Sequence, residues 1–201
     1  MKLFRLASAV VLLLTAAVAP TQMKAQSQGN FGIYLNPYFT HITDSQVDPS
    51  SFSFLGLNTK SRMFWGLQGG GYYDFIHSGP LAAGFTVRWS DQHAANASIR
   101  DFQVGARVAG TVGDRLRPYA EVTVGDASTK PEKATVRINK AAYAVYGGVD
   151  YGLARHFDFR AIEVGYGSVT VVSGSTVGPG NGANYPPVKL LSFSTGFVVR
   201  F

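Results

Sequence analysis

The chain has 201 residues, no cysteine and a formal net charge of +6. Without cysteine no disulfide can stabilise the fold, and the charges are scattered, with no basic cluster of the kind that binds nucleic acid. Aromatic residues make up 13% of the chain and Gly occurs 23 times, beside plentiful Val and Thr, which is typical of β-structure.

Residues 1–25 have the order of a cleaved secretory signal peptide. Two basic residues come before an apolar run over residues 6–18, and small residues follow. The run is about 13 residues long, whereas a membrane-spanning helix needs about 20, so a membrane anchor is disfavoured. Residues 26–201 are then one mature domain. Cleavage after Ala19 is the less favoured alternative, because a proline would follow the cut.

In the mature domain, apolar and polar residues alternate with the period of two that predicts β-strands. The predicted strands cover residues 30–42, 61–76, 81–90, 98–110, 116–125, 138–151, 157–169 and 188–201. The long or polar connections are residues 43–60, 91–97, 126–137 and 173–187. They alternate with short turns, and such sorting of loops to one end is typical of membrane barrels.

Three features depart from the simple strand pattern. Pro37 lacks a backbone donor in the middle of the first strand, and a bulge would accommodate it. Residues 69–71 are three glycines inside the second strand. No helix follows them, so tight barrel curvature explains them better than a phosphate-binding loop. In the seventh strand Arg160 and Glu163 fall on opposite faces, so these faces stay unassigned.

The alternation alone does not separate a membrane barrel from a soluble sandwich, because the apolar face meets lipid in one and the core in the other. Trp65 and Trp89 fall at the long-loop ends of their strands, and Tyr73, Tyr151 and Phe201 fall at the short-turn ends. Aromatic girdles have this placement. With the signal peptide, this favours an all-β, eight-stranded antiparallel up-and-down transmembrane β-barrel over an exported soluble barrel or sandwich.

The last strand carries a second signal. Residues 194–201 alternate strictly and end on an aromatic ring. Gly196, Val199 and Phe201 have the spacing of the C-terminal assembly signal of bacterial outer-membrane β-barrels, which this segment resembles. An ordinary closing strand of a soluble β-domain is the alternative.

Over nearly its whole mature length the chain resembles the small outer-membrane β-barrels of the OmpA/OmpX type. The resemblance implies location in the bacterial outer membrane, contact with outer-membrane lipid, and assembly by the barrel insertion machinery with periplasmic chaperones. We expect a monomer. Larger members continue into a periplasmic peptidoglycan-binding domain, but here the sequence ends on the barrel signal, so that role is not implied.

Charged residues of both signs are predicted to face into the barrel: Arg62, Arg88, Arg107, Arg200, Asp74, Asp101, Glu121 and Asp150. Hairpin geometry puts Arg88 opposite Asp101 and Arg107 near Glu121, which predicts two interior ion pairs. Arg200 can form a third pair with Asp74 or Asp150 near the short-turn end. Buried charges must be paired or hydrated, so we interpret them as a salt-bridged plug, with a narrow ion path as the alternative.

The residues that could carry chemistry form no catalytic motif. His41 and His93 fall near Ser and Asp residues at the long-loop end, but these are ordinary loop residues, and no metal-ligand spacing recurs. We therefore predict no enzyme, no cofactor and no metal. The predicted role is structural or surface interaction through external loops whose partner is unknown. A narrow porin-like channel is the alternative, and a lipid A-modifying enzyme is a third hypothesis.

Overall fold

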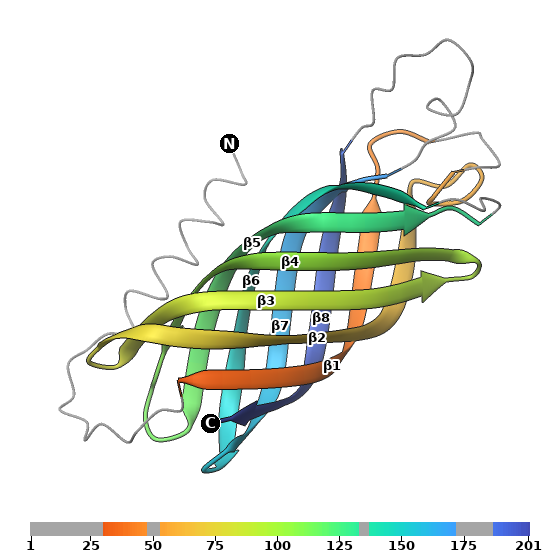
Figure 1. Ribbon diagram of the computed structural model, residues 1–201. Coiled ribbons are helices and arrows are strands. Elements are labelled where there is room, and N and C mark those ends of the chain that lie inside the picture. Colours follow the sequence, from red (N-terminus) through yellow and green to blue (C-terminus); the bar gives the residue numbers. More distant parts are fainter. Residues whose placement is uncertain (1–29, 48–52, 133–136, 172–186) are drawn as a thin grey trace.

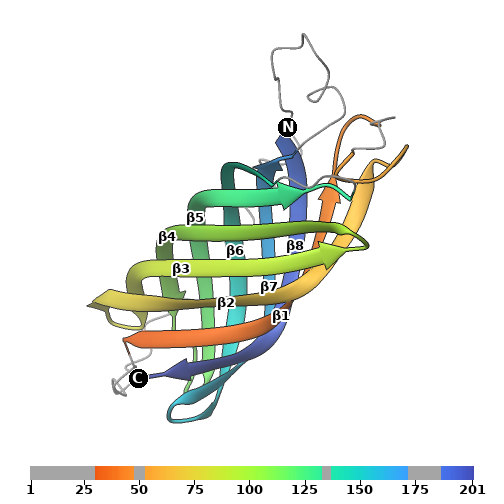
Figure 2. The same cartoon turned by 45° about the vertical axis from the view of Figure 1, so that its right-hand side comes forward.

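The computed structural model describes residues 30–47, 53–132, 137–171 and 187–201. They form a closed ring of eight antiparallel strands (Figure 1, Figure 2), which confirms the predicted fold. The strands are β1 (Phe31–Thr43), β2 (Ser61–Ser78), β3 (Leu81–Ala94), β4 (Ala97–Gly110), β5 (Leu116–Lys130), β6 (Ile138–Ala154), β7 (Phe157–Thr170) and β8 (Pro187–Arg200). Each strand pairs with the next, and β1 pairs with β8, so no edge stays open. The predicted signal peptide lies outside the described residues.

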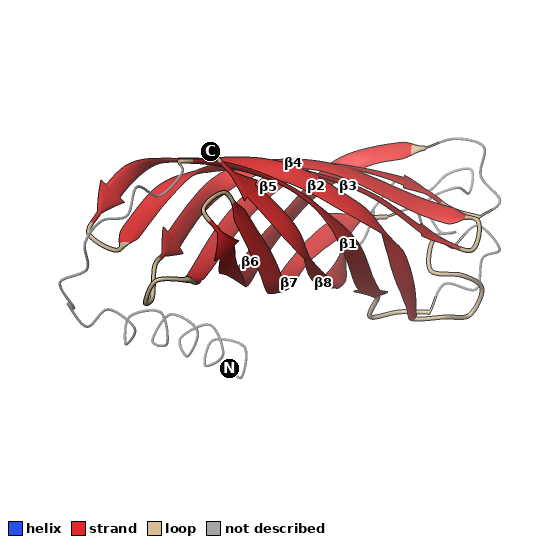
Figure 3. Ribbon diagram, turned by 90° about the horizontal axis from the view of Figure 1, so that it is seen from below, coloured by secondary structure: helices blue, strands red, loops and turns tan. Residues whose placement is uncertain are grey.

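The two ends of the barrel differ in their connections. At the turn end the strands are joined by residues 79–80, 111–115 and 155–156. At the opposite end, called the loop end, the connections are residues 44–60, 95–96, 131–137 and 171–186. Figure 3 draws the described chain as strands and loops. Within the described ranges, no helix has the length and apolar character needed to cross a membrane.

The prediction of a loop at residues 91–97 is wrong. β3 continues to Ala94 and β4 begins at Ala97, so only a two-residue turn lies between them. Asp91 and Arg100 are paired residues of the ladder. Their polarity made this stretch look like a loop in the sequence, although the backbone is still β-strand.

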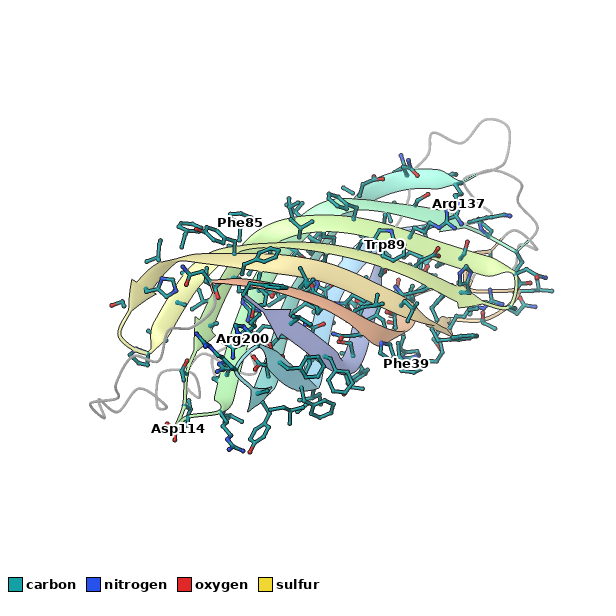
Figure 4. All side chains as sticks on the ribbon, turned by 60° about the horizontal axis from the view of Figure 1, so that its bottom comes forward. Phe39, Phe85, Trp89, Asp114, Arg137 and Arg200 are labelled. Atoms are coloured by element: carbon teal, nitrogen blue, oxygen red, sulfur yellow. The ribbon has the colours of Figure 1, made fainter. Side chains whose placement is uncertain are left out.

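Inward and outward residues alternate through the middle of the barrel wall. Val122 leaves 62% of its surface exposed, whereas its neighbour Thr123 is 2% exposed. The outward face is apolar, and Phe39, Phe85 and Trp89 lie on it (Figure 4). The inward face is polar, which is the arrangement of a membrane barrel.

Toward the loop end this pattern reverses. The outward face becomes polar, with Arg100 and Lys130. The inward face becomes apolar, and Ile42 and Ile99 belong to one buried cluster. Polar outside and apolar inside is the pattern of a soluble barrel, so the strands extend past the apolar band into water. This extension explains why β5 reaches Lys130 rather than its predicted end at residue 125.

A β-bulge settles the faces of β7 that the sequence left open. The register against β8 shifts between Arg160 and Glu163. The extra residue lets both side chains point into the lumen, where they are 0% and 1% exposed. Ile162, between them, is 51% exposed on the outside.

The closing pair of strands, β1 and β8, lacks ladder pairs at Asn36 and Pro37, although the register is the same on both sides of the gap. Pro37 has no N–H to donate. Asn36 Oδ1 accepts a hydrogen bond from the backbone N–H of Phe197 at 3.0 Å. A side chain therefore replaces part of the missing ladder at this seam.

Candidate functional site

Charged side chains gathered around Glu163 of β7 fill the middle of the lumen. The Glu163 carboxylate lies 2.5 Å from Arg88 Nη2 of β3 and 3.1 Å from Arg160 Nη1. It also accepts hydrogen bonds from the side chains of Gln68, Tyr119 and Ser194. One carboxylate thus joins side chains from β2, β3, β5, β7 and β8, and these contacts cross the lumen.

Glu121 of β5 continues this network on the other side of Arg88. Its two carboxylate oxygens lie 2.5 Å from Arg88 Nη1 and 2.7 Å from Arg107 Nη1. Arg160 also places its Nε 2.9 Å from Asp150. Each guanidinium of the network has at least one carboxylate partner, as the burial of a charge requires.

Tyrosine rings cover the flat faces of the buried guanidinium groups. Arg88 Cζ lies 3.8 Å from the ring centroid of Tyr146, and Arg107 Cζ lies 4.0 Å from that of Tyr72. All four side chains are buried. A desolvated cation–π contact contributes about 2 kcal/mol, so the rings add to the ion pairs in holding the network together.

The two predicted ion pairs have different outcomes. Arg107 and Glu121 are paired residues of β4 and β5, and their side chains meet at 2.7 Å. The predicted Arg88–Asp101 pair is wrong, because Arg88 faces Gln103 across the ladder. The hairpin turn lies one residue later than the sequence pattern indicated, which moves Asp101 out of register with Arg88.

Arg200 does not pair with Asp74 or Asp150, its predicted partners. Its Nε lies 2.6 Å from Asp158 Oδ2, and Arg117 Nη1 lies 2.6 Å from Asp158 Oδ1. This trio lies at the turn end of the lumen. It forms a second charged cluster in which one carboxylate serves two guanidinium groups.

Sequence reasoning missed the charged residues of β7. Asp158, Arg160 and Glu163 are all buried in the lumen, with exposures of 0% to 1%. The bulge interrupts the alternation, so no single parity assigns all three to one face. The available signal was their charge, because lipid-facing positions of a barrel are apolar.

The lumen of the loop end is filled by apolar side chains. Phe54, from the connection after β1, is 1% exposed and stacks on Phe64 with ring centroids 4.9 Å apart. Arg62 Nη1 donates a hydrogen bond to the Phe54 carbonyl at 3.1 Å, and Arg62 also pairs with Glu132. The segment that carries Phe54 therefore folds into the barrel, where Phe54 belongs to the apolar cluster of the loop end.

A family comparison adds to this geometry. The model of the outer membrane protein beta-barrel domain matches residues 8–201. The chain belongs to the outer-membrane β-barrel family. Its place in the cell is accordingly the bacterial outer membrane. In such barrels the short turns face the periplasm, so the turn end is periplasmic and the loop end is external.

Solved outer-membrane barrels resemble this family member in fold. Neisserial surface protein A has 13% sequence identity and a TM-score of 0.58, and the match covers 88% of this chain and 100% of that chain. Ail of Yersinia pestis has 11% identity and a TM-score of 0.51, with 87% and 99% covered. At these identities the likeness shows the fold alone. No curated protein matches the chain.

Of the predicted assembly residues of this outer-membrane barrel, Gly196 and Val199 lie in β8 and Phe201 directly follows it. Phe201 is 61% exposed, and its ring centroid lies 5.9 Å from that of Phe31. Val199 pairs with β1. Gly196 lies against Asn36, and a Cβ at this position would overlap the Asn36 side chain. Packing therefore requires glycine there, and recognition by the insertion machinery stays a prediction.

Two histidines of this outer-membrane barrel, His93 and His156, make local contacts. His93 Nε2 lies 3.2 Å from Asp91 Oδ1 on the outer wall. His156 Nδ1 lies 2.9 Å from the Arg200 carbonyl at the turn end. In the part of the chain that the structure describes, no group of three His, Asp or Glu residues is placed to hold a metal ion.

Proposed function

We propose that this family member is a closed barrel with a structural or surface-interaction role, exerted through its loop end. The observation that carries the proposal is the meeting of side chains from five strands at the Glu163 carboxylate. The apolar layer around Phe54 closes the barrel at a second level. A barrel closed at both levels is better suited to be a scaffold for external loops than a channel for solutes or ions.

The alternative function is a narrow porin-like channel for small solutes or ions. A passing ion has to separate pairs such as Arg88–Glu163, and breaking a buried pair costs about 3–5 kcal/mol. Eight strands also enclose a space that side chains just fill. The cost of separating the buried pairs and the narrow interior both favour the closed barrel.

Single-channel recording in planar bilayers tests the closed lumen. We expect the wild-type protein to show no steady conductance. Phe54→Ala should also be silent, because the Glu163 network still crosses the lumen beneath the apolar layer. Reproducible wild-type steps whose size changes in Arg107→Ala or Glu121→Gln would favour the channel instead.

We also propose that the protein has no catalytic role. The family description and the two similar structures name outer-membrane or surface proteins and no reaction. Mass analysis of lipid A from bacteria with and without the expressed protein tests this. A protein-dependent mass change would favour the lipid A-modifying enzyme.

We propose the following partners for assembly and for the surface role. The barrel insertion machinery and periplasmic chaperones deliver a monomer, outer-membrane lipid surrounds it, and an external partner binds at the loop end. Light scattering of the folded protein in a defined detergent measures the oligomeric state, and a mass of two chains would contradict the monomer.

A further inference from the structure

Cationic side chains on the outer wall gather at one end of the barrel. In the described strands, the outward-facing lysine and arginine residues are Arg100 of β4, Lys130 of β5 and Lys189 of β8. All three lie toward the loop end. Among the described strands, outward-facing positive charge therefore lies at the external end, whereas the exposed Arg115 and Arg155 belong to turns at the periplasmic end.

Two of these cations belong to one patch on the outside of β4 and β5. Arg100 is paired with Ser128 and Lys130 with Ser98, so the two cations lie on a diagonal. Arg137 folds back over the same wall and donates hydrogen bonds to Ser98 Oγ at 2.9 Å and to the Ser128 carbonyl at 3.3 Å. We call Arg100, Lys130 and Arg137 the basic patch.

Carboxylates near the basic patch leave it positive. Asp91 Oδ2 accepts a hydrogen bond from Arg100 Nε at 2.8 Å, and Asp126 lies on the same wall of β5. Asp91 thereby orients the guanidinium through Nε alone. The two Nη groups of Arg100, whose side chain is 51% exposed, have no acceptor among the described residues. Three cations face two carboxylates on this wall, and Glu132 of the neighbouring connection is paired with Arg62.

The basic patch lies directly above the apolar band. Trp89 pairs with Phe102 on this wall, two residues nearer the membrane than Arg100. Trp65 pairs with His93 beside it. Figure 4 shows Trp89 and Arg137 on the same side of the barrel. Because tryptophan is enriched at the headgroup level, the basic patch is at the depth of lipid phosphates.

We propose that the basic patch binds the phosphate group of a phosphorylated glycolipid, of the lipid A class, in the external leaflet. The unused Nη fork of Arg100 has the planar geometry that holds phosphate oxygens in pairs. Lys130 and Arg137 add charge on one side, and Trp89 packs against the lipid below. This inference rests on the proposed surface role and names one partner of the loop end.

Tryptophan fluorescence provides a local readout, because Trp65 and Trp89 are the two tryptophans of the chain. Folded protein in neutral detergent is titrated with bis-phosphorylated lipid A and with the same lipid after removal of its phosphates. We expect a saturable change with an apparent Kd at least about tenfold lower for the phosphorylated lipid. Equal binding of the two lipids would overturn the proposal.

Inorganic phosphate distinguishes a lipid site from a simple anion site. We expect millimolar phosphate to leave most of the lipid A bound, because the acyl chains contribute to affinity. Complete competition by phosphate at the concentration of the lipid would overturn the assignment to a glycolipid.

Two single variants distinguish binding at the basic patch from non-specific electrostatic attraction between the lipid phosphate and the protein. Arg100→Gln should weaken binding of the phosphorylated lipid by about tenfold and leave binding of the dephosphorylated lipid unchanged. Lys189→Gln removes an outward cation at the same end but from β8, and we expect no comparable loss. Equal losses in both variants would overturn the site. Migration on unheated gels verifies folding, and conductance is measured separately, so failure here leaves the closed-barrel proposal standing.

Discussion

Glu163 is buried in the lumen, and its two carboxylate oxygens pair with Arg88 and Arg160. Glu163→Gln removes the charge with little change in shape and leaves Arg88 and Arg160 short of a buried partner. We expect the free energy of unfolding to fall by about 3–5 kcal/mol. Urea unfolding of the protein in lipid micelles, followed by tryptophan fluorescence, measures the change.

Asp91→Asn is the matched control for Glu163→Gln. It removes a carboxylate from the exposed pair with Arg100, and such a surface pair contributes about 0–1 kcal/mol. If both variants lost the same small amount, water would have to reach Glu163, and the lumen would not be dry.

Phe201 lies at the turn end with most of its surface exposed. Its ring contacts Phe31 but fills no buried space. We expect Phe201→Ala to lower the amount of protein in the outer membrane while refolding in detergent stays nearly intact. Quantitative blots of membrane fractions and refolding yields measure the two effects. Equal loss in both settings would make Phe201 an ordinary packing residue.

At the scale of one strand, β5 separates the two faces of the wall. Val122→Arg puts a charge on the lipid face and should hinder insertion, at a cost of about 2–4 kcal/mol near the membrane midplane. Thr123→Arg points into the lumen, where polar partners can receive it, although crowding adds some cost. Folded yield after refolding into lipid vesicles compares them. Normal insertion of Val122→Arg beside failure of Thr123→Arg would invert the assigned faces.

The strands could be predicted wherever one environment acts along their whole length. Alternation identified β5 near Val122, because lipid on one side and lumen on the other impose a period of two. The prediction failed where a strand passes from lipid into water, as at Asp91, since a polar outward face then looks like a loop. It also failed in β7, where an added residue changes the parity between Arg160 and Glu163.

The candidate site was predictable only for neighbours in one hairpin. The pair of Arg107 and Glu121 could be predicted from the position of the short turn between β4 and β5, because directly paired strands fix which side chains are opposite. Arg88 reaches Glu163 across the lumen, 75 positions away in the chain. Such a contact depends on barrel diameter and on long side chains crossing it, and neither is encoded in local alternation.

For the whole molecule, closure through β1 and β8 is the decisive feature. The outer face of the barrel wall contacts lipid around the middle and water around the loop end. The side chains that face the lumen change accordingly, from charged in the middle to apolar at the loop end. The seam at Pro37 is the place where this wall has fewest ladder pairs. Opening of the barrel should therefore begin there.

Unheated gel migration tests closure directly. Because every strand has two neighbours, detergent finds no edge to open, and the unboiled protein should run as a compact band distinct from the boiled form. Identical migration before and after boiling would count against a closed barrel.

Asn36→Ala removes the side-chain acceptor that bridges the seam to Phe197, so we expect the compact band to disappear at a lower temperature. Asn139→Ala, an exposed change in the uninterrupted ladder between β5 and β6, is the control and should leave that temperature unchanged. An equal shift in both variants would show that opening does not begin at the seam.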